Sequence, residues 1–431
     1  MLNIFNLTEK LQQCNTYIAR LEEQNEALRQ KAELQQKVRS TDSASRYEQR
    51  KEAYLRPIRE MTAYVGSAYE FRHNVVRDSY EMRRRDDDAA EWLPVDERQL
   101  NTIMNQVQDE GRVFCLKSLV TQRIRSEMAY DYHPVADYLS QVRGTWDGNN
   151  RLDALACRIS RSDYCRRMVP VWLRSMVAQW LSIDDCHANA VMLLLISPRQ
   201  GLHKSTFLHQ LLPDSLSQYY TDDYSLTSKS NAERKLVEFA IINIDEFDKL
   251  PPKKMPELKT LMQTLRPSFV KAYRTNFNLL PRIASFVGTS NERHVLTDRT
   301  GSRRFLILEP DDIIDIDGID HDQLYAQLVH EVEAGARSYF TKDEEAEMQR
   351  VNQPYYRLTP IEQLFRQFFR RPEPDEDFQS LSAAQLMEML RRHAPSLLRQ
   401  ESVTSFGRML TRLAIPRDHQ HLGNTYRVVA L

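Results

Sequence analysis

The chain has few glycines, no closely spaced cysteine pair and no long apolar run. Glycine occupies 11 of 431 positions, so long flexible linkers are not expected. The five cysteines are scattered and odd in number, which is typical of a protein from a reducing cytoplasm. No apolar run approaches the roughly 20 residues of a membrane helix, and no signal peptide is evident. We therefore expect a cytoplasmic protein with no membrane partner.

The charges nearly cancel, since 59 lysines and arginines face 60 aspartates and glutamates. This balance excludes a globally basic nucleic-acid coat, so any DNA contact must come from local patches. The length predicts two to four domains with ample material for a core.

An apolar run, a short loop and a Lys-Ser-Thr triplet follow one another in residues 191–206, VMLLLISPRQGLHKST. This layout is typical of a phosphate-binding P-loop, in which Lys204 supplies positive charge and Ser205 ligates Mg²⁺. Measured against G-x-x-x-x-G-K-[ST], Pro198 and His203 replace both glycines, and a strained backbone there costs roughly 1–3 kcal/mol. The site is therefore either active or degenerate. The predicted nucleotide-binding residues are Gly201, Leu202, His203, Lys204, Ser205 and Thr206.

A second apolar run ends in two acidic residues, in residues 236–250, LVEFAIINIDEFDKL. We expect this acidic strand to lie beside the P-loop strand, with Asp245 organising Mg²⁺ and Glu246 polarising the attacking water. The alternative interpretation is a core strand that ends in an acidic loop. The helix-like segments between Lys204 and this run favour the ATPase interpretation.

A third apolar run, IASFVGTSN (283–291), ends in Asn291, which can contact the γ-phosphate or the attacking water. The motif TGSRRF follows, with Arg303 and Arg304 just before another apolar run. Paired arginines are usually solvated or salt-bridged, but in this position one is a candidate arginine finger, worth about 10³–10⁵ in rate. The predicted catalytic residues are Asp245, Glu246, Asn291, Arg303 and Arg304.

Together these motifs resemble a known family. The segments that carry the resemblance are WDGNNRL (146–152), SPRQGLHKST, INIDEFDKL, LKTLMQTLRPSFVKAYR, PRIASFVGTSN and TGSRRF. They are similar to the virulence-associated protein E family, P-loop proteins of phages, plasmids and genomic islands that are related to superfamily 3 replicative helicases. The resemblance implies an α/β P-loop core with an AAA+-type sheet, and an ATPase of mobile-element DNA replication that uses ATP and Mg²⁺.

The resemblance also implies an assembly and a DNA path. It implies a homo-oligomer such as a hexamer, with ATP bound between subunits and a neighbour's Arg303 or Arg304 completing the site. After Pro267 we predict a β-hairpin whose Lys271 and Arg274 contact single-stranded DNA, the alternative being two ordinary surface cations. No primase acidic triad is visible, so primer synthesis would need a separate primase.

The N-terminal segment has apolar residues at alternating spacings of four and three. The positions are Leu7, Leu11, Cys14, Ile18, Leu21, Leu28 and Ala32, with Asn25 on the same seam. This pattern predicts a short coiled coil, in which one buried Asn favours a defined register and often a dimer. The alternative is an amphipathic helix docked on its own chain.

The remaining segments complete a four-part plan. Residues 56–140 carry helical patterns, and within them we interpret the arginine- and aromatic-containing stretch 69–94 as a solvated loop, because Asp86 to Asp88 cancel its positive charge. Beyond Asp343, three amphipathic helices and a terminal hairpin predict a winged-helix-like domain that binds duplex DNA or protein. The predicted parts are a coiled coil (1–38), a helical adaptor (39–150), the P-loop ATPase domain (151–345) and the winged-helix-like domain (346–431).

The sequence thus predicts an oligomeric, superfamily 3-like helicase that hydrolyses ATP to act on DNA. Two alternatives remain open. One is a degenerate P-loop protein that serves as a DNA-binding or scaffolding module without hydrolysis. The other is a defence or regulatory ATPase that uses the same core without helicase action.

Overall fold

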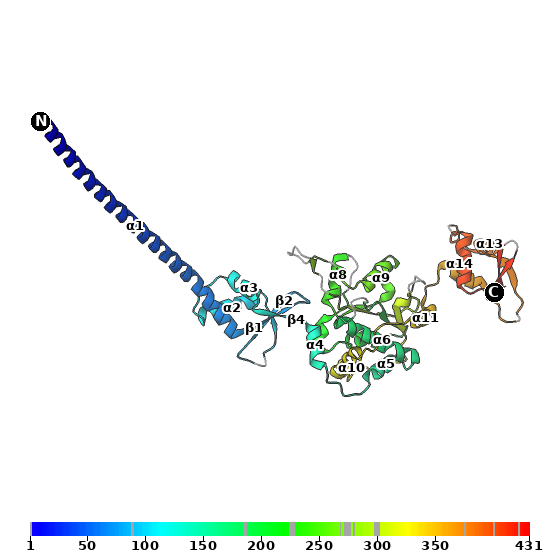
Figure 1. Cartoon of the computed structure of the whole chain (residues 1–431). Helices are drawn as coiled ribbons and strands as arrows, with labels where there is room; N and C mark the ends of the chain where they lie inside the picture. The colour runs from blue at the N-terminus through cyan, green and yellow to red at the C-terminus, as the bar shows by residue number, and fades with distance from the viewer. Residues whose placement is uncertain are drawn as a thin grey trace. The chain divides into compact units, whose positions relative to one another are not determined.

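The structure is a computed structural model that describes residues 2–87, 90–183, 188–223, 229–267, 269–270, 277–278, 281–296, 302–374, 376–399, 401–420 and 423–431. The chain divides into two compact units, residues 1–133 and 134–431, and each is described by itself. Figure 1 shows the elements along the chain. No helix in the described ranges combines the length and the apolar character that a membrane span requires.

The first unit joins one long helix to a small sheet. Its elements are α1 (Leu2–Ala68), β1 (Tyr69–Asn74), β2 (Ser79–Arg84), β3 (Leu93–Pro94), α2 (Glu97–Asp109), α3 (Lys117–Ile124) and β4 (Ala129–Tyr132). The sheet order is β3-β2-β1-β4, with β1 antiparallel to β2 and parallel to β4. The last turns of α1 bury Met61 and Val65 against Phe71, Ile103 and Val120, so α1 enters this core at its C-terminal end.

The prediction of a solvated loop over 69–94 is wrong, because most of this stretch forms the β1–β2 hairpin and β3. The physical reason is a period of two: Tyr69, Phe71 and Met82 point inward and are buried, while the arginines alternate with them. Two of the arginines are neutralised across the strands, Arg72 by Glu81 at 2.6 Å and Arg83 by Glu70 at 2.7 Å. The helical patterns predicted for this region are present on either side, in α1, α2 and α3.

The second unit is built on a parallel sheet, which confirms the predicted mixed α/β architecture. Its strands are β5 (Met192–Ile196), β6 (Tyr220–Thr221), β7 (Ile241–Ile244), β10 (Ser285–Ser290) and β11 (Phe305–Leu308), in the order β11-β5-β10-β7-β6. Every pairing along this path is parallel. The three central strands are buried on both faces, as expected for a parallel sheet covered by helices.

Helices cover both faces of this sheet (Figure 1), with α8 and α9 on one side and α5, α6 and α10 on the other. Their bounds are α4 (Pro134–Val142), α5 (Arg151–Ile159), α6 (Asp163–Trp180), α7 (Lys204–His209), α8 (Lys229–Glu238), α9 (Met255–Gln263), α10 (His321–Glu333) and α11 (Lys342–Val351). Short 3₁₀ turns are η1 (Asp214–Tyr219), η2 (Phe247–Lys249), η3 (Pro252–Lys254), η4 (Ser302–Arg304) and η5 (Gln353–Tyr355). Leu236 of α8 and Leu258 of α9 pack with Leu194 and Phe286 of the sheet.

The acidic strand does not lie directly beside the P-loop strand, and this expectation is corrected. Strand β10 is inserted between β5 and β7, pairing in parallel with both. Gly288 allows this close packing, since a Cβ at this position would lie 2.3 Å from Met192 Cε and 2.9 Å from the Ile244 carbonyl oxygen. The insertion brings Asn291, just beyond the end of β10, between the P-loop and the acidic residues.

The predicted hairpin after Pro267 is present as β8 (Phe269–Val270) paired with β9 (Phe277–Asn278). Lys271 and Arg274 lie between these strands, outside the described residues. The C-terminal helices and the terminal hairpin are also confirmed. They are α12 (Pro360–Phe368), β12 (Phe369–Arg370), β13 (Gln379–Ser382), α13 (Ala383–His393), α14 (Val403–Arg412), β14 (Arg417–Gln420) and β15 (Gly423–Ala430). A separate core of Phe365, Leu390, Phe406 and Val428 holds them together.

Candidate functional site

The loop between β5 and α7 forms one wall of a cavity at the carboxyl ends of the central strands. Gly201 and His203 both have positive φ, +75° and +59°. Leu202 anchors the loop, because its side chain is buried and its carbonyl oxygen accepts a hydrogen bond from the amide of Ile314 at 3.2 Å. The loop therefore makes the left-handed turn that the missing glycine would ordinarily supply, with a histidine in its place.

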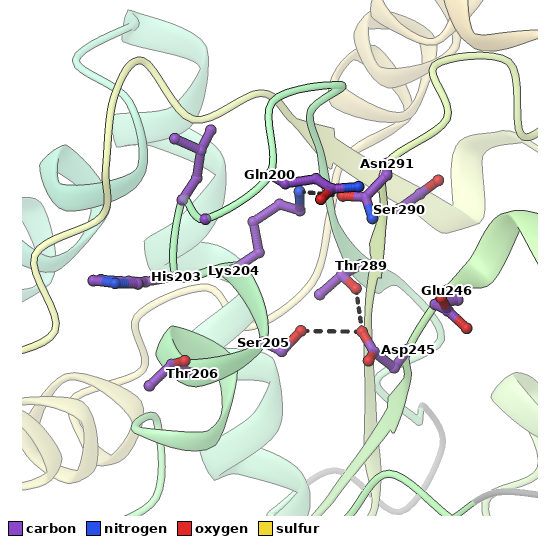
Figure 2. A pocket seen from close by; sticks show the side chains of 12 residues that line it. Gln200, His203, Lys204, Ser205, Thr206, Asp245, Glu246, Thr289, Ser290 and Asn291 are labelled. Atoms are coloured by element: carbon purple, nitrogen blue, oxygen red, sulfur yellow. Dashed lines mark hydrogen bonds between the residues drawn. The ribbon is translucent and has the colours of Figure 1, made fainter.

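Lys204 begins α7 and points across the loop toward β10 (Figure 2). Its Nζ donates to Asn291 Oδ1 at 2.9 Å and lies 3.2 Å and 3.4 Å from the carbonyl oxygens of Ser197 and Arg199. Burial lowers the pKa of this ammonium group, against a raising influence from Asp245. A buried positive charge held only by neutral oxygens is ready to accept an anion.

Asp245 accepts hydrogen bonds from two hydroxyl groups that come from different elements, α7 and β10. Ser205 Oγ donates to Asp245 Oδ1 at 3.0 Å, and Thr289 Oγ1 donates to the same oxygen. A carboxylate next to a serine hydroxyl is the oxygen donor set that Mg²⁺ prefers. These residues therefore fit a magnesium ion that would also carry phosphate oxygens.

Glu246 follows in a left-handed conformation, with φ of +51°. Its carboxylate forms an ion pair with Lys249, 2.6 Å from Glu246 Oε2 to Lys249 Nζ, and both side chains are more than half exposed. Two residues further on, Asp248 accepts a hydrogen bond from Ser290 Oγ at 2.8 Å. The loop after the acidic strand is thus tied to the end of β10.

The cavity has a volume of about 400 Å³, within the range of small-molecule sites. It is lined by Gln200, Gly201, Leu202, His203, Lys204, Ser205, Thr206, Asp245, Glu246, Thr289, Ser290 and Asn291. The structure therefore brings all six predicted nucleotide-binding residues together with three of the predicted catalytic ones. Figure 2 shows the Lys204 ammonium group directed at Asn291 and the Ser205 hydroxyl directed at Asp245, whereas the His203 ring is directed away from both.

Arg303 and Arg304 are absent from the described lining of this cavity. They lie in η4, immediately before β11, and Arg303 Nη1 forms an ion pair with Glu345 Oε2 at 3.0 Å. Sequence reasoning missed three residues of the lining, Gln200, Thr289 and Ser290. The signal was present, because Thr289 and Asn291 are two residues apart at the end of one strand and so face the same side.

Two family models match the chain. The first, the virulence-associated protein E-like domain, matches residues 139–357, which is more than half of the chain. This chain belongs to the virulence-associated protein E-like family. The matched range contains the whole cavity, which lies in this family's shared domain. The second model, a domain of unknown function described from a B. Theta gene, matches residues 358–428.

Solved structures add weaker likenesses to this virulence-associated protein E-like chain. The apo structure of the NrS-1 C-terminal region (305-718) is 12% identical with a TM-score of 0.40, and the match covers 87% of this chain and 99% of that one. The A form of the same region is 11% identical, with the same TM-score and coverages. No curated protein matches the chain significantly.

Proposed function

We propose that this chain is an ATPase of mobile-element or phage DNA replication that works as an oligomeric, superfamily 3-like helicase. The observation that carries the proposal is the convergence of Lys204, Ser205 and Asp245 on one cavity at the carboxyl ends of a parallel sheet. The insertion of β10 between the P-loop strand and the acidic strand supports an AAA+-type sheet, because it places Asn291 within reach of both.

Each residue then has a role in binding or hydrolysis. Lys204 would leave Asn291 and hold the β- and γ-phosphates, and Ser205 and Asp245 would hold Mg²⁺, which neutralises phosphate charge when bound. Asn291 would contact the γ-phosphate, and Glu246 would orient the attacking water. Thr289 keeps the Asp245 carboxylate directed at Ser205 and so preserves the metal-binding geometry.

The test of this site compares Lys204→Ala with Lys253→Ala in calorimetric titrations with ATP and Mg²⁺. Lys253 is an exposed lysine of η3 that does not line the cavity, so its loss is a matched control. We expect Lys204→Ala to lose ATP binding and Lys253→Ala to keep it. Equal binding by wild type and Lys204→Ala would refute the site.

One observation favours the alternative of a nucleotide-binding scaffold without hydrolysis. Lys249 neutralises the carboxylate of Glu246 that should act on water. A turnover assay on Glu246→Gln and Lys249→Ala separates the two functions. An ATPase should lose turnover but retain ATP binding in Glu246→Gln, and should keep or gain turnover in Lys249→Ala. A scaffold should show no turnover in the wild type.

We also propose that DNA contacts are divided between the hairpin that carries Lys271 and Arg274 and the C-terminal domain. A winged-helix-like fold for the latter is supported by its three helices and by the pairing of β13 and β14 with β15. Arginines outnumber acidic residues from Arg391 onward, although Arg427 is neutralised by Asp418 through two hydrogen bonds of 2.5 and 2.7 Å.

A neighbouring subunit's Arg303 or Arg304 would complete the ATP site. Arg303 would first have to leave its ion pair with Glu345.

A further inference from the structure

The N-terminal half of α1 is a helix with an uncovered apolar seam. Every described side chain from Lys10 to Lys37 is exposed. The large aliphatic side chains of the seam are 41–64% exposed, namely Leu11, Ile18, Leu21 and Leu28. Most helices in proteins are stabilised by packing of an apolar face, and this stretch packs on nothing among the described residues of its own unit, 1–133. Among the described residues of 1–133, the helix is therefore not docked through this seam.

The seam has the spacing of a two-stranded coiled coil and a defined length. If Leu11 is position a, then Cys14, Leu21 and Leu28 are at d, and Ile18 and Asn25 are at a. Isoleucine at a with leucine at d favours two parallel strands. The next core positions after Ala32 are Gln35 and Arg39, so the seam ends there.

We propose that this seam is covered by a second copy of the same chain, parallel and in register. Asn25 decides the partner, because a buried amide without a hydrogen-bonding partner is costly. In a parallel pair each Asn25 meets the Asn25 of the other copy at the same level. An apolar partner, or an antiparallel copy aligned on the same seam, would leave Asn25 against aliphatic side chains.

Cys14 provides the test. Parallel alignment places the two copies of Cys14 at the same d level, close enough for a disulfide, whereas antiparallel alignment separates them along the helix. The full chain is treated with diamide, which accepts the two electrons and two protons released by two thiols. We expect a covalent dimer on a non-reducing gel in the wild type and none in Cys14→Ser. Leu21→Glu should also abolish it and reduce the mass measured by light scattering.

Three results would overturn this proposal. A chain that stays monomeric in light scattering, or a dimer that Leu21→Glu leaves intact, removes the seam as the interface. A dimer sensitive to Leu21→Glu but without Cys14 cross-linking refutes the parallel register. Folding of the variants is checked through the cluster around Met61 and Val65, which lies on α1 far from the seam.

A separate observation concerns Arg357, the last residue matched by the virulence-associated protein E-like model. Its guanidinium donates to the carbonyl oxygen of Asp248 at 2.6 Å and to that of His294 at 3.0 Å. Its amide donates to the carbonyl oxygen of Leu296 at 2.8 Å. One side chain thus joins the loop after the acidic strand to the loop after Asn291, a few residues before α12 begins at Pro360.

We infer that Arg357 is a positioning residue that couples the cavity to the C-terminal domain, an inference that rests on the proposed ATP site. Asp248 is tied to Ser290 at the cavity wall, and the amide of Leu296 donates to the carbonyl oxygen of Tyr355. A shift of Asn291 on contact with phosphate would therefore move the segment that leads into α12.

Hydrogen exchange on the full chain, with and without ATP and Mg²⁺, tests this coupling. We expect ATP to change exchange over residues 358–368 in the wild type and in Arg350→Ala, an exposed arginine of α11 that serves as control. The difference should disappear in Arg357→Ala and return in part in Arg357→Lys. Retention of the full difference in an Arg357→Ala protein shown to bind ATP overturns the coupling alone. Absence of ATP binding in the wild type overturns the proposed site and this inference with it.

Discussion

Replacing His203 separates the backbone strain of the P-loop from the chemistry that the loop supports. His203 has φ +59° and ψ +24°, and its ring is exposed. A left-handed conformation costs an L-residue roughly 1–2 kcal/mol, and glycine removes that cost. Glycine also increases the entropy of the unfolded chain, which lowers stability by about 0.4–1 kcal/mol. We therefore expect His203→Gly to raise the free energy of unfolding by between about 0 and 1.6 kcal/mol.

Two companion variants sharpen this measurement. His203→Val should lower the free energy of unfolding by about 1–3 kcal/mol, because a β-branched residue is strained at positive φ. Ser182, which has φ +51° and does not line the cavity, is the matched control. Ser182→Gly should relieve comparable strain and leave ATP binding unchanged.

The assay is urea unfolding of each variant, followed by ATP turnover at saturating Mg²⁺. We expect His203→Gly to maintain or raise turnover, since the ring is directed away from Lys204 and Asp245 (Figure 2). A large loss of turnover in a stable His203→Gly protein would show that the imidazole itself acts on the nucleotide. Equal stability of His203→Val and wild type would refute the left-handed conformation.

The remaining predictions concern charge, packing, assembly and DNA. Burial lowers the pKa of Lys204 below its ordinary 10.5, and only the protonated form attracts phosphate. As the pH is raised, ATP affinity should therefore begin to fall at a lower pH than it would if this lysine were exposed. Lys204→Arg should flatten this pH profile in calorimetric titrations. Gly288→Ala should lower the free energy of unfolding by about 1–3 kcal/mol in urea titrations, because its Cβ would crowd the Ile244 carbonyl. Mixing Arg304→Ala with Lys204→Ala protomers should restore some ATPase activity, and no recovery in confirmed assemblies would mean that the arginine only braces its own subunit. Deleting residues 360–431 should flatten the salt dependence of duplex affinity, since each phosphate contact contributes a slope of roughly 0.7–0.9; an unchanged slope would make this domain a protein-binding module.

Sequence patterns predicted the parallel sheet and the elements that carry the cavity, because buried strands are continuous apolar runs with polar ends. They did not predict that β10 lies between β5 and β7. Strand order depends on side-chain volume at contacts between strands, such as Gly288 with Met192. The pattern of apolar and polar residues along the sequence does not reveal which strands make those contacts.

Residues 69–94 form strands for a reason that charge density does not report. Charge density suggested solvent exposure there, but Arg72 and Arg83 are each neutralised across the strands, by Glu81 and Glu70. Cross-strand pairing of this kind depends on register, which sequence spacing alone did not reveal. The hydrogen bond from Thr289 to Asp245 was missed for a similar reason, since Thr289 is on β10 and Asp245 follows β7.

The seam on α1 has a consequence for the number of subunits in any assembly. In a two-stranded coiled coil each α1 pairs with the α1 of one other chain. An assembly in which every Asn25 side chain has its counterpart as a hydrogen-bonding partner must therefore contain an even number of chains. If the ATP sites close into a ring and the two chains of each helix pair are neighbours in it, interfaces that share a helix pair alternate with interfaces that do not. Six identical sequences would in that case occupy two kinds of interface, and their ATP sites would not all be equivalent.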